Sequence, residues 1–147
     1  MLSRRKFLQV VGTSGAAVGA AACSEEYDFT PEVGRWDVGV PDEYTEGELR
    51  FFETGPILVG RDAGGMYAMS AICTHQACVL GDEPDEVDGS MDPPIECGCH
   101  QSQYDANGVD LAGPSARPLQ HYVVTLEAGR LIADTGVKAD RDARLVV

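Results

Sequence analysis

The chain has 147 residues, enough for one domain with a short appendage, and its 24 acidic against 11 basic residues give a net charge of −13. This excess of negative charge excludes nucleic acid and anionic membrane surfaces as electrostatic partners, because both are themselves negatively charged. A basic partner protein fits this charge, and so does plain solubility without any partner.

The amino terminus predicts an export signal. Residues 3–8, Ser-Arg-Arg-Lys-Phe-Leu, resemble the twin-arginine motif, and a weakly apolar run follows them. That run, Phe7 to Ala22, has only 16 residues and includes polar side chains and glycines, whereas a stable membrane span needs about 20 strongly apolar residues. We therefore expect residues 1–22 to be a cleaved signal peptide and the protein to work on the periplasmic or extracytoplasmic face of a membrane. Cleavage would change the net charge from −13 to −16, because three basic and no acidic residues would be lost.

Cys23 follows this segment directly. Ala20-Ala21-Ala22-Cys23 resembles a lipoprotein processing site, although Ala20 stands where leucine is usual. We expect Cys23 to become the lipidated first residue of the mature chain, which would hold the protein at a membrane surface. Cleavage at an ordinary small-residue site and an uncleaved anchor remain open alternatives. Residues 23–32 are short, polar and acidic, and are expected to form a tether.

From residue 33 onward, short apolar or alternating runs separated by turn residues predict an all-β domain. The predicted strands are Arg35–Val40, Leu49–Glu53, Ile57–Arg61, Met66–Ile72, Gln120–Leu126 and Leu131–Ala133. Residues 61–65 predict a hairpin turn, and residues 81–96, with seven acids and no bases, an exposed loop. The alternation in residues 120–126 places His121 on a strand face rather than at a metal. The tail from Asp134 is charged, and its last three residues are a candidate edge strand.

Four of the five cysteines and two of the three histidines lie in two six-residue segments. These are Cys73-Thr74-His75-Gln76-Ala77-Cys78 and Cys97-Gly98-Cys99-His100-Gln101-Ser102. Thiolate and neutral imidazole together suit soft or borderline metals. A closed zinc site leaves two cysteines without a role, and two disulfides leave both histidines without one. A [2Fe-2S] cluster held by two cysteines and two histidines, with a disulfide between the other cysteines, accounts for all six residues.

The two segments resemble the cluster loops of Rieske iron-sulfur proteins, which run Cys-Thr-His-Leu-Gly-Cys and Cys-Pro-Cys-His-Gly-Ser. The likeness covers roughly residues 66–133 and continues through Gln103-Tyr104-Asp105, Gly108, Gly113-Pro114 and Pro118-Leu119. It implies a Rieske-type antiparallel β-sandwich over residues 33–147, with a small cluster-binding subdomain of two loops at about residues 73–118. The implied cofactor is a [2Fe-2S] cluster.

The resemblance also implies the role of each residue in the loops. The implied ligands are Cys73 and Cys97 on one iron and His75 and His100 on the other. Cys78 and Cys99 would form the disulfide that locks the loops. Ser102 and Tyr104 would donate hydrogen bonds to the cluster sulfurs, which favours the reduced state and raises the potential. Residues 113–118 would cover the cluster from a third side.

The function implied is one-electron transfer in an exported, membrane-tethered protein. In Rieske proteins the ligand histidines lose protons more readily when the cluster is oxidised, so the potential should fall as pH rises. The expected partner is a redox protein, either a cytochrome or an oxidoreductase subunit. A chain of this length is too short to include the catalytic domain of a Rieske oxygenase.

Quinol is the less favoured partner. Gln76-Ala77 and Gln101 replace the Leu-Gly and Gly of the family loops, which makes the loop tips polar. A polar tip costs desolvation in an apolar quinol pocket. The alternative function is a Rieske subunit of a quinol–cytochrome c reductase, or of an extracytoplasmic oxidase such as arsenite oxidase.

Overall fold

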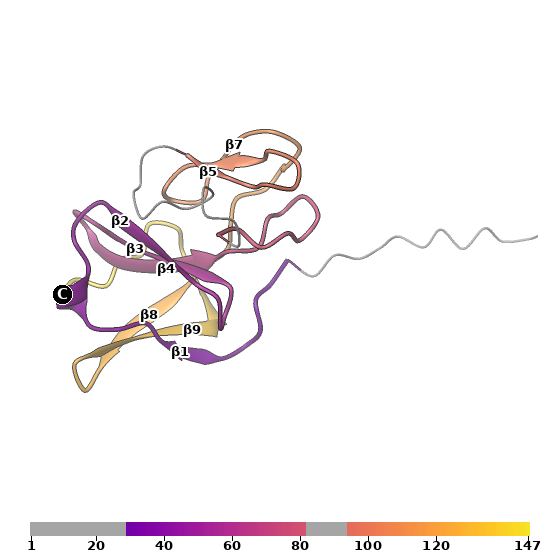
Figure 1. The fold of residues 1–147 in the computed structure, drawn as a ribbon. Coiled ribbons are helices and arrows are strands. Elements are labelled where there is room, and N and C mark those ends of the chain that lie inside the picture. The colour runs from indigo at the N-terminus through magenta and orange to yellow at the C-terminus, as the bar shows by residue number, and fades with distance from the viewer. Residues whose placement is uncertain (1–28, 82–93) are drawn as a thin grey trace, which may run out of the picture.

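The computed structural model describes residues 29–81 and 94–147. The predicted signal peptide, Cys23 and most of the acidic loop lie outside these residues. The regular secondary structure of the described chain is β except for one turn of 3-10 helix at Pro41–Glu43 (Figure 1). No helix in this part of the chain has the length and apolarity to cross a membrane.

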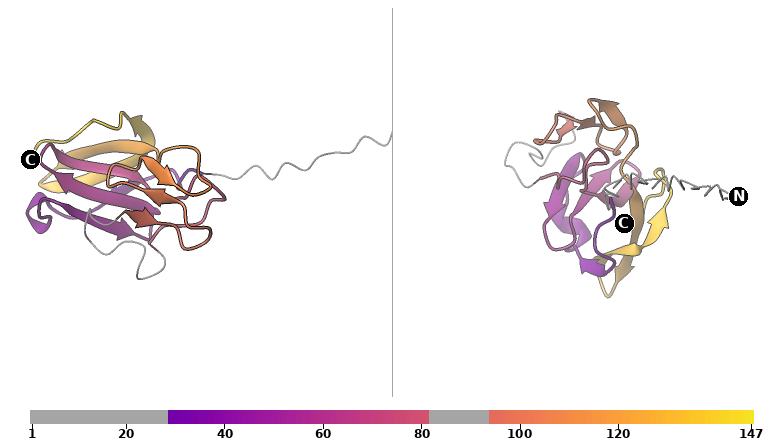
Figure 2. Two further views of the ribbon diagram at one scale, coloured as in Figure 1. Left: turned by 90° about the horizontal axis from the view of Figure 1, so that it is seen from above. Right: turned by 90° about the vertical axis from the view of Figure 1, so that its right-hand side faces the viewer.

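Six strands form one antiparallel sheet in the order β1-β9-β8-β4-β3-β2. The strands are β1 Arg35–Asp37, β2 Glu48–Phe52, β3 Ile57–Asp62, β4 Gly65–Ser70, β8 His121–Glu127 and β9 Arg130–Ala139. The sheet curls so that β2, β3 and β4 face β8, β9 and β1 across an apolar core (Figures 1 and 2). The predicted all-β sandwich is confirmed, and so is the hairpin between β3 and β4, which pairs Asp62 with Gly65.

Strands β3 and β4 are buried on both faces. Ile57, Val59 and Ala68 point into the core inside the curled sheet, whereas Leu58 and Tyr67 point into a second core on its outer side. Successive residues of a strand alternate between its faces. The unbroken apolar run in β3 therefore fills two cores with one strand.

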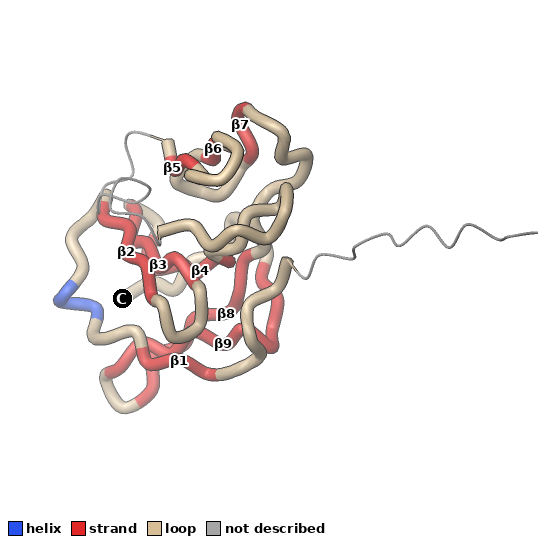
Figure 3. The backbone as a smooth tube through the Cα atoms, turned by 45° about the vertical axis from the view of Figure 1, so that its right-hand side comes forward, coloured by secondary structure: helices blue, strands red, loops and turns tan. Residues whose placement is uncertain are grey.

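The second core lies under a small three-stranded sheet in the order β5-β6-β7. Its strands are β5 Ile95–Glu96, β6 Gln103–Tyr104 and β7 Asp110–Ala112. This sheet sits over the outer side of β2–β4 (Figure 3). Ile95 and Tyr104 contribute to a buried cluster that also contains Met69 and Leu119. The segment that holds the second cysteine-histidine motif is thus packed against the larger sheet.

Two predicted strand ends were wrong by three residues or more. β1 stops at Asp37 rather than Val40, because Gly39 adopts φ +100° and turns the chain into the 3-10 helix. β9 runs ten residues to Ala139, although the sequence predicted a strand only to Ala133. The extension includes Thr135, which is buried and whose Oγ1 accepts a hydrogen bond from the Gly34 backbone N–H at 2.8 Å.

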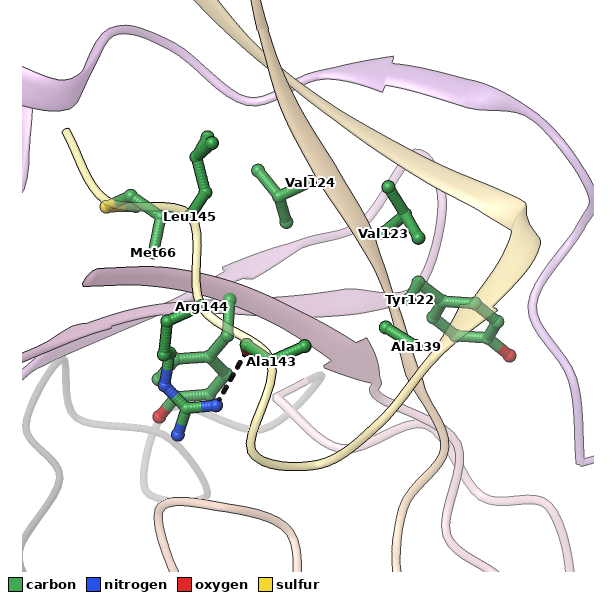
Figure 4. Close-up of a pocket in the computed structure, with 9 residues that line it drawn as sticks. Met66, Tyr122, Val123, Val124, Ala139, Ala143, Arg144 and Leu145 are labelled. Carbon is green, nitrogen blue, oxygen red and sulfur yellow. Dashed lines mark hydrogen bonds between the residues drawn. The ribbon is translucent and has the colours of Figure 1, made fainter. Parts of the chain in front are cut away.

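The carboxyl-terminal tail forms a single bridge instead of an edge strand. Leu145 pairs with Met66 of β4 through two backbone hydrogen bonds of 2.8 and 2.9 Å. Arg144 secures the same segment, because its Nε donates to Asp62 and its guanidinium lies over the Tyr67 ring. A cavity of about 150 Å³ remains between this tail, β4 and β8 (Figure 4). The tail thus closes one side of the curled sheet.

Candidate metal centre

The two cysteine-histidine loops are connected to strands of different sheets. The first follows β4 and is closed by an antiparallel bridge between Ile72 and Val79. The second joins β5 to β6, where Ile95 pairs with Tyr104. The two motifs are 24 positions apart in sequence at Cys73 and Cys97, so their meeting depends on packing the small sheet against the large one.

Both loops have the same backbone turn. In each, the first residue donates its N–H to the carbonyl of the sixth residue, at 2.8 Å in both loops. The fifth residue donates its N–H to the carbonyl of the first, at 3.0 Å in the first loop and 2.8 Å in the second. The first residues are Cys73 and Cys97. The histidine takes the third position in one turn and the fourth in the other, as the sequence spacing requires.

The fifth residue of each turn is left-handed but is not glycine. Ala77 has φ +57° and Gln101 has φ +60°. A residue with a Cβ pays about 1 kcal/mol or more in this region, where its Cβ crowds the carbonyl oxygen. Both loops therefore carry backbone strain at the position where the resembled family has glycine.

We expect Ala77→Gly and Gln101→Gly each to stabilise the protein by roughly 0.5–1 kcal/mol. The glycine relieves left-handed strain, and its greater freedom in the unfolded chain offsets part of the gain. The measurement is the urea midpoint of each variant. Gln76→Gly is the matched control, because Gln76 is not left-handed and glycine there should destabilise. A loss of stability in both Ala77→Gly and Gln101→Gly would contradict the strain.

A disulfide between Cys78 and Cys99 joins the two loops, as predicted. The bond spans 21 positions of sequence. The Cys97 sulfur lies within 4.8 Å of both disulfide sulfurs. Cys73 and Cys97 are the free cysteines of the described chain. They are therefore the cysteines that can offer a thiolate to a metal.

The four remaining motif residues form two facing pairs. Cys73 and Cys97 are each 1% exposed, and the Cys73 side chain lies within hydrogen-bonding reach of Cys97. Burial raises the pKa of the Cys97 thiol, so deprotonation at neutral pH would need a cation to stabilise the thiolate. The rings of His75 and His100 meet edge to face, with centroids 4.7 Å apart.

One ring nitrogen of His75 indicates whether a metal ion fits between the loops. Its Nδ1 is buried and has no hydrogen-bond partner among the described residues. Buried polar atoms normally have a partner, and a metal ion would supply one. Two thiols on one side and two imidazoles on the other fit a cofactor with two metal ions. The same four residues would also suit a tetrahedral zinc, so side-chain chemistry alone does not choose between the two.

Tyr104 connects the thiol side to its surroundings. Its hydroxyl lies 3.3 Å from Cys73 Sγ and accepts a hydrogen bond from the Thr74 N–H at 3.0 Å. The Thr74 hydroxyl is 3.1 Å from the same oxygen and donates its own proton to the Arg117 carbonyl at 2.7 Å. The proton of Tyr104 therefore points to Cys73 or to Thr74. Burial raises the pKa of Tyr104, which keeps this donor protonated.

The third predicted segment, residues 113–118, touches both loops. Besides the Thr74–Arg117 bond, the Ser115 N–H donates to the fully buried Ser102 Oγ at 3.1 Å. Gly113 has φ +88°, and a Cβ there would lie 2.6 Å from the Gln101 carbonyl oxygen. Because Ser102 accepts from Ser115, its own proton is available to donate. Its donation to a cluster sulfur stays a prediction.

His121 lies on a strand face as predicted, with its ring stacked on Tyr67 and its Nε2 2.9 Å from the Asn107 carbonyl. Burial lowers the pKa of His121, so the neutral ring donates this hydrogen bond. Thr74 was not singled out from the sequence, because nothing in the first motif marks its hydroxyl as the link to Arg117.

Comparison with known proteins identifies the family of these loops. Residues 35–123 match the family model described as the Rieske [2Fe-2S] domain. The cytochrome b6-f complex iron-sulfur subunit of Chlorobaculum tepidum is 31% identical over 140 residues, which cover 88% of this chain and 74% of that protein. The cytochrome bc1 complex Rieske iron-sulfur subunit of Corynebacterium efficiens is 43% identical over 74 residues, covering 48% of this chain and 17% of that protein.

Solved structures agree on the fold. A chain of the complex between reduced oxygenase and oxidised ferredoxin of carbazole 1,9a-dioxygenase aligns with a TM-score of 0.52 at 21% identity, covering 72% of this chain and 97% of that chain. Naphthalene 1,2-dioxygenase aligns with a TM-score of 0.55 at 16% identity, covering 77% of this chain and 27% of that chain. At such identities the likeness concerns the fold alone.

Proposed function

The chain belongs to the Rieske [2Fe-2S] domain family, and from this premise we propose that its cluster is held by Cys73, Cys97, His75 and His100. The facing thiols would bind one iron and the facing imidazoles the other. The buried, unpartnered His75 Nδ1 is the observation that supports this assignment most directly. The family also decides between the two metal types, since it is defined by a [2Fe-2S] cluster rather than zinc.

The function is Rieske-type electron transfer. A bound cluster of this type accepts and returns one electron. Around it the protein keeps the two thiols out of water, whereas His100 is exposed and His75 is half-buried. The imidazole side is therefore the side at which a partner approaches most closely. Tyr104 and Ser102 place hydroxyl groups where they can stabilise added negative charge on sulfur.

We propose further that the partner is a redox protein and that the carrier is exported and lipid-anchored through Cys23. Gln76 and Gln101 are both exposed beside the histidines, so the tips of both loops offer amide groups rather than an apolar surface. Burying unpaired amides in an apolar pocket is unfavourable. A hydrated protein interface satisfies them with partner groups or water.

A second candidate is a subunit of a quinol-oxidising complex. It is favoured by the similar proteins from Chlorobaculum and Corynebacterium, which are named as subunits of cytochrome b6-f and bc1 complexes. Purification from native membranes in mild detergent separates the two candidates. Stoichiometric b-type haem accompanying the chain supports the complex, and its absence supports the separate carrier.

The central test is an EPR spectrum of the dithionite-reduced full chain, with a redox titration at two pH values. A rhombic signal typical of histidine-ligated clusters and a potential that falls as pH rises would support the proposed ligands. A cluster with a low potential that does not depend on pH would instead favour a ferredoxin-type carrier. A colourless protein containing zinc after anaerobic preparation would overturn the function.

Tyr104→Phe should lower the reduction potential by roughly 60 mV. The lost hydroxyl is 3.3 Å from Cys73 Sγ, and a hydrogen bond that favours the reduced state by about 1.4 kcal/mol corresponds to this shift for one electron. The measurement is a redox titration followed by EPR. Tyr67→Phe is the matched control, because the Tyr67 hydroxyl donates to the Ala106 carbonyl. Equal potentials in Tyr104→Phe and wild type would show that Tyr104 directs its proton to Thr74.

A further inference from the structure

Two exposed cations without an acidic partner lie together at one place on this acidic protein. Of the other described arginines, four form ion pairs with acidic residues, and Arg141, which is exposed, forms none. The ion pairs are Arg35–Glu127, Arg35–Asp134, Arg50–Glu48, Arg130–Asp37 and Arg144–Asp62. Arg61 donates to two backbone carbonyls instead. Arg117 and Lys138 form no ion pair with any residue of the described ranges, and both are exposed.

Arg117 and Lys138 line the same groove. Its volume is about 310 Å³, and its other walls are formed by Phe29, Thr30, Thr74, Pro118 and Gln120. The Arg117 guanidinium lies 4.6 Å over the Phe29 ring, which fixes its position without neutralising its charge. A second hollow shares Pro118 and Gln120 with the groove and adds Arg141 and Asp140.

The groove adjoins the metal centre through Thr74. This residue lines the groove and precedes the proposed ligand His75. Its hydroxyl donates to the Arg117 carbonyl, and its N–H donates to the Tyr104 hydroxyl, which lies beside Cys73 Sγ. A partner bound in the groove would therefore sit next to the first cluster loop, and electron transfer requires such proximity.

We propose that this groove, lined by Arg117 and Lys138, docks a carboxylate-bearing segment of the redox partner. The inference rests on the proposed electron-transfer function and adds the chemistry of the partner's contact surface. Charge complementarity selects the occupant, because two cations without a carboxylate partner attract acidic side chains at close range. At about 0.15 M salt the screening length is about 8 Å, so these local charges outweigh the more distant negative charge of the whole chain.

The groove favours the opposite partner charge from the one expected from net charge alone. A net charge of −13 favours a basic partner at long range. The docking groove presents the opposite sign beside the first cluster loop. An acidic segment next to the partner's own redox centre would then bind in one orientation, since most other surfaces of this chain would repel it.

The test uses a fluorescently labelled hexaglutamate peptide and the cluster-loaded full chain. Affinity is measured by fluorescence anisotropy at low and at physiological salt, for wild type and for two double variants. R117Q/K138Q removes the groove charges. R35Q/R130Q removes two cations near β1 and the β8–β9 turn and changes the net charge by the same amount, so it is the matched control.

We expect R117Q/K138Q to weaken peptide binding at least tenfold at low salt, and R35Q/R130Q to change it less than twofold. Wild-type binding should weaken as salt rises. Equal weakening in both double variants would overturn the proposal, because net charge would then explain the binding. Binding only to an E25Q/E26Q/D28N variant would also overturn it, since the acids that precede Phe29 would then occupy the groove themselves.

Electron transfer gives the second readout. The reduced chain is mixed with a small c-type cytochrome that carries acidic residues around its haem edge, and separately with the cationic oxidant tris(phenanthroline)cobalt(III). R117Q/K138Q should slow the first reaction about tenfold and should not slow the second, because removing positive charge cannot weaken the approach of a cation. Unchanged rates with both oxidants would reject the docking role even if the peptide binds. A chain without a cluster would fail with both oxidants, and that outcome refutes the proposed function instead.

Discussion

His100→Ala is expected to lose the [2Fe-2S] cluster, and with it the visible colour, the bound iron and the EPR signal of the reduced protein. With the proposed ligands, the variant would leave one iron with a single protein ligand, whereas a Rieske cluster has two imidazoles there. His100 is exposed, so truncating its side chain removes little packing and the β-fold should persist. Iron content, absorption and far-ultraviolet circular dichroism measure both effects.

His121→Gln is the matched control for this loss. His121 is buried, and its Nε2 contacts the Asn107 carbonyl, which a glutamine amide can also reach. We expect this variant to retain full iron and the wild-type EPR signal. If His100→Ala keeps both irons and an unchanged spectrum, His100 is not a ligand. If His121→Gln loses the cluster while staying folded, His121 rather than His100 is the ligand.

Removing the disulfide with Cys78→Ala/Cys99→Ala should cost about 3 kcal/mol of unfolding free energy. The estimate is the loop-closure entropy for a cross-link that spans 21 positions. Both cysteines are replaced together, because a single variant would leave a reactive thiol close to Cys97. Urea unfolding of the cluster-loaded protein measures the change.

Wild-type protein treated with a reductant is the control for the disulfide variant. Wild-type protein whose disulfide has been reduced should unfold at the same urea concentration as Cys78→Ala/Cys99→Ala. A difference of less than 1 kcal/mol between the oxidised wild type and the variant would show that packing of the small sheet, rather than the cross-link, holds the loops together.

The large sheet was predictable because its strands are short apolar or alternating runs between turn residues. These runs located β2, β3, β4 and β8 within two residues at each end. The sequence did not predict β5, β6 and β7, which have two or three residues each. Such short strands show no period, and tertiary contacts around Tyr104 specify them. The second half of β9 was missed because Asp134, Gly136 and Lys138 look like an exposed tail.

The sequence predicted the candidate ligands and the disulfide of the metal centre, but not the backbone turns and contacts around them. The spacing of cysteines and histidines pointed to the candidate ligands, and the likeness to family loops gave the disulfide that the structure confirms. The left-handed turns at Ala77 and Gln101 have no signal in those residue types. The link from Thr74 to Arg117 and the groove beside it join segments 43 positions apart, and only the folded chain brings them together.

The first loop follows a strand of the large sheet and the second joins two strands of the small sheet, so contacts between the loops affect how easily the small sheet opens. The disulfide, the facing thiols and the facing imidazoles each take one residue from the first loop and one from the second. All three links therefore tie the small sheet to the large one. In a hydrogen-exchange experiment, amides of β5–β7 should behave as one cooperative unit whose opening free energy falls when metal or disulfide is lost. Amides in the middle of β3 and β4 should hardly respond. The cofactor would then stabilise the small sheet against local opening and leave the stability of the large sheet almost unchanged.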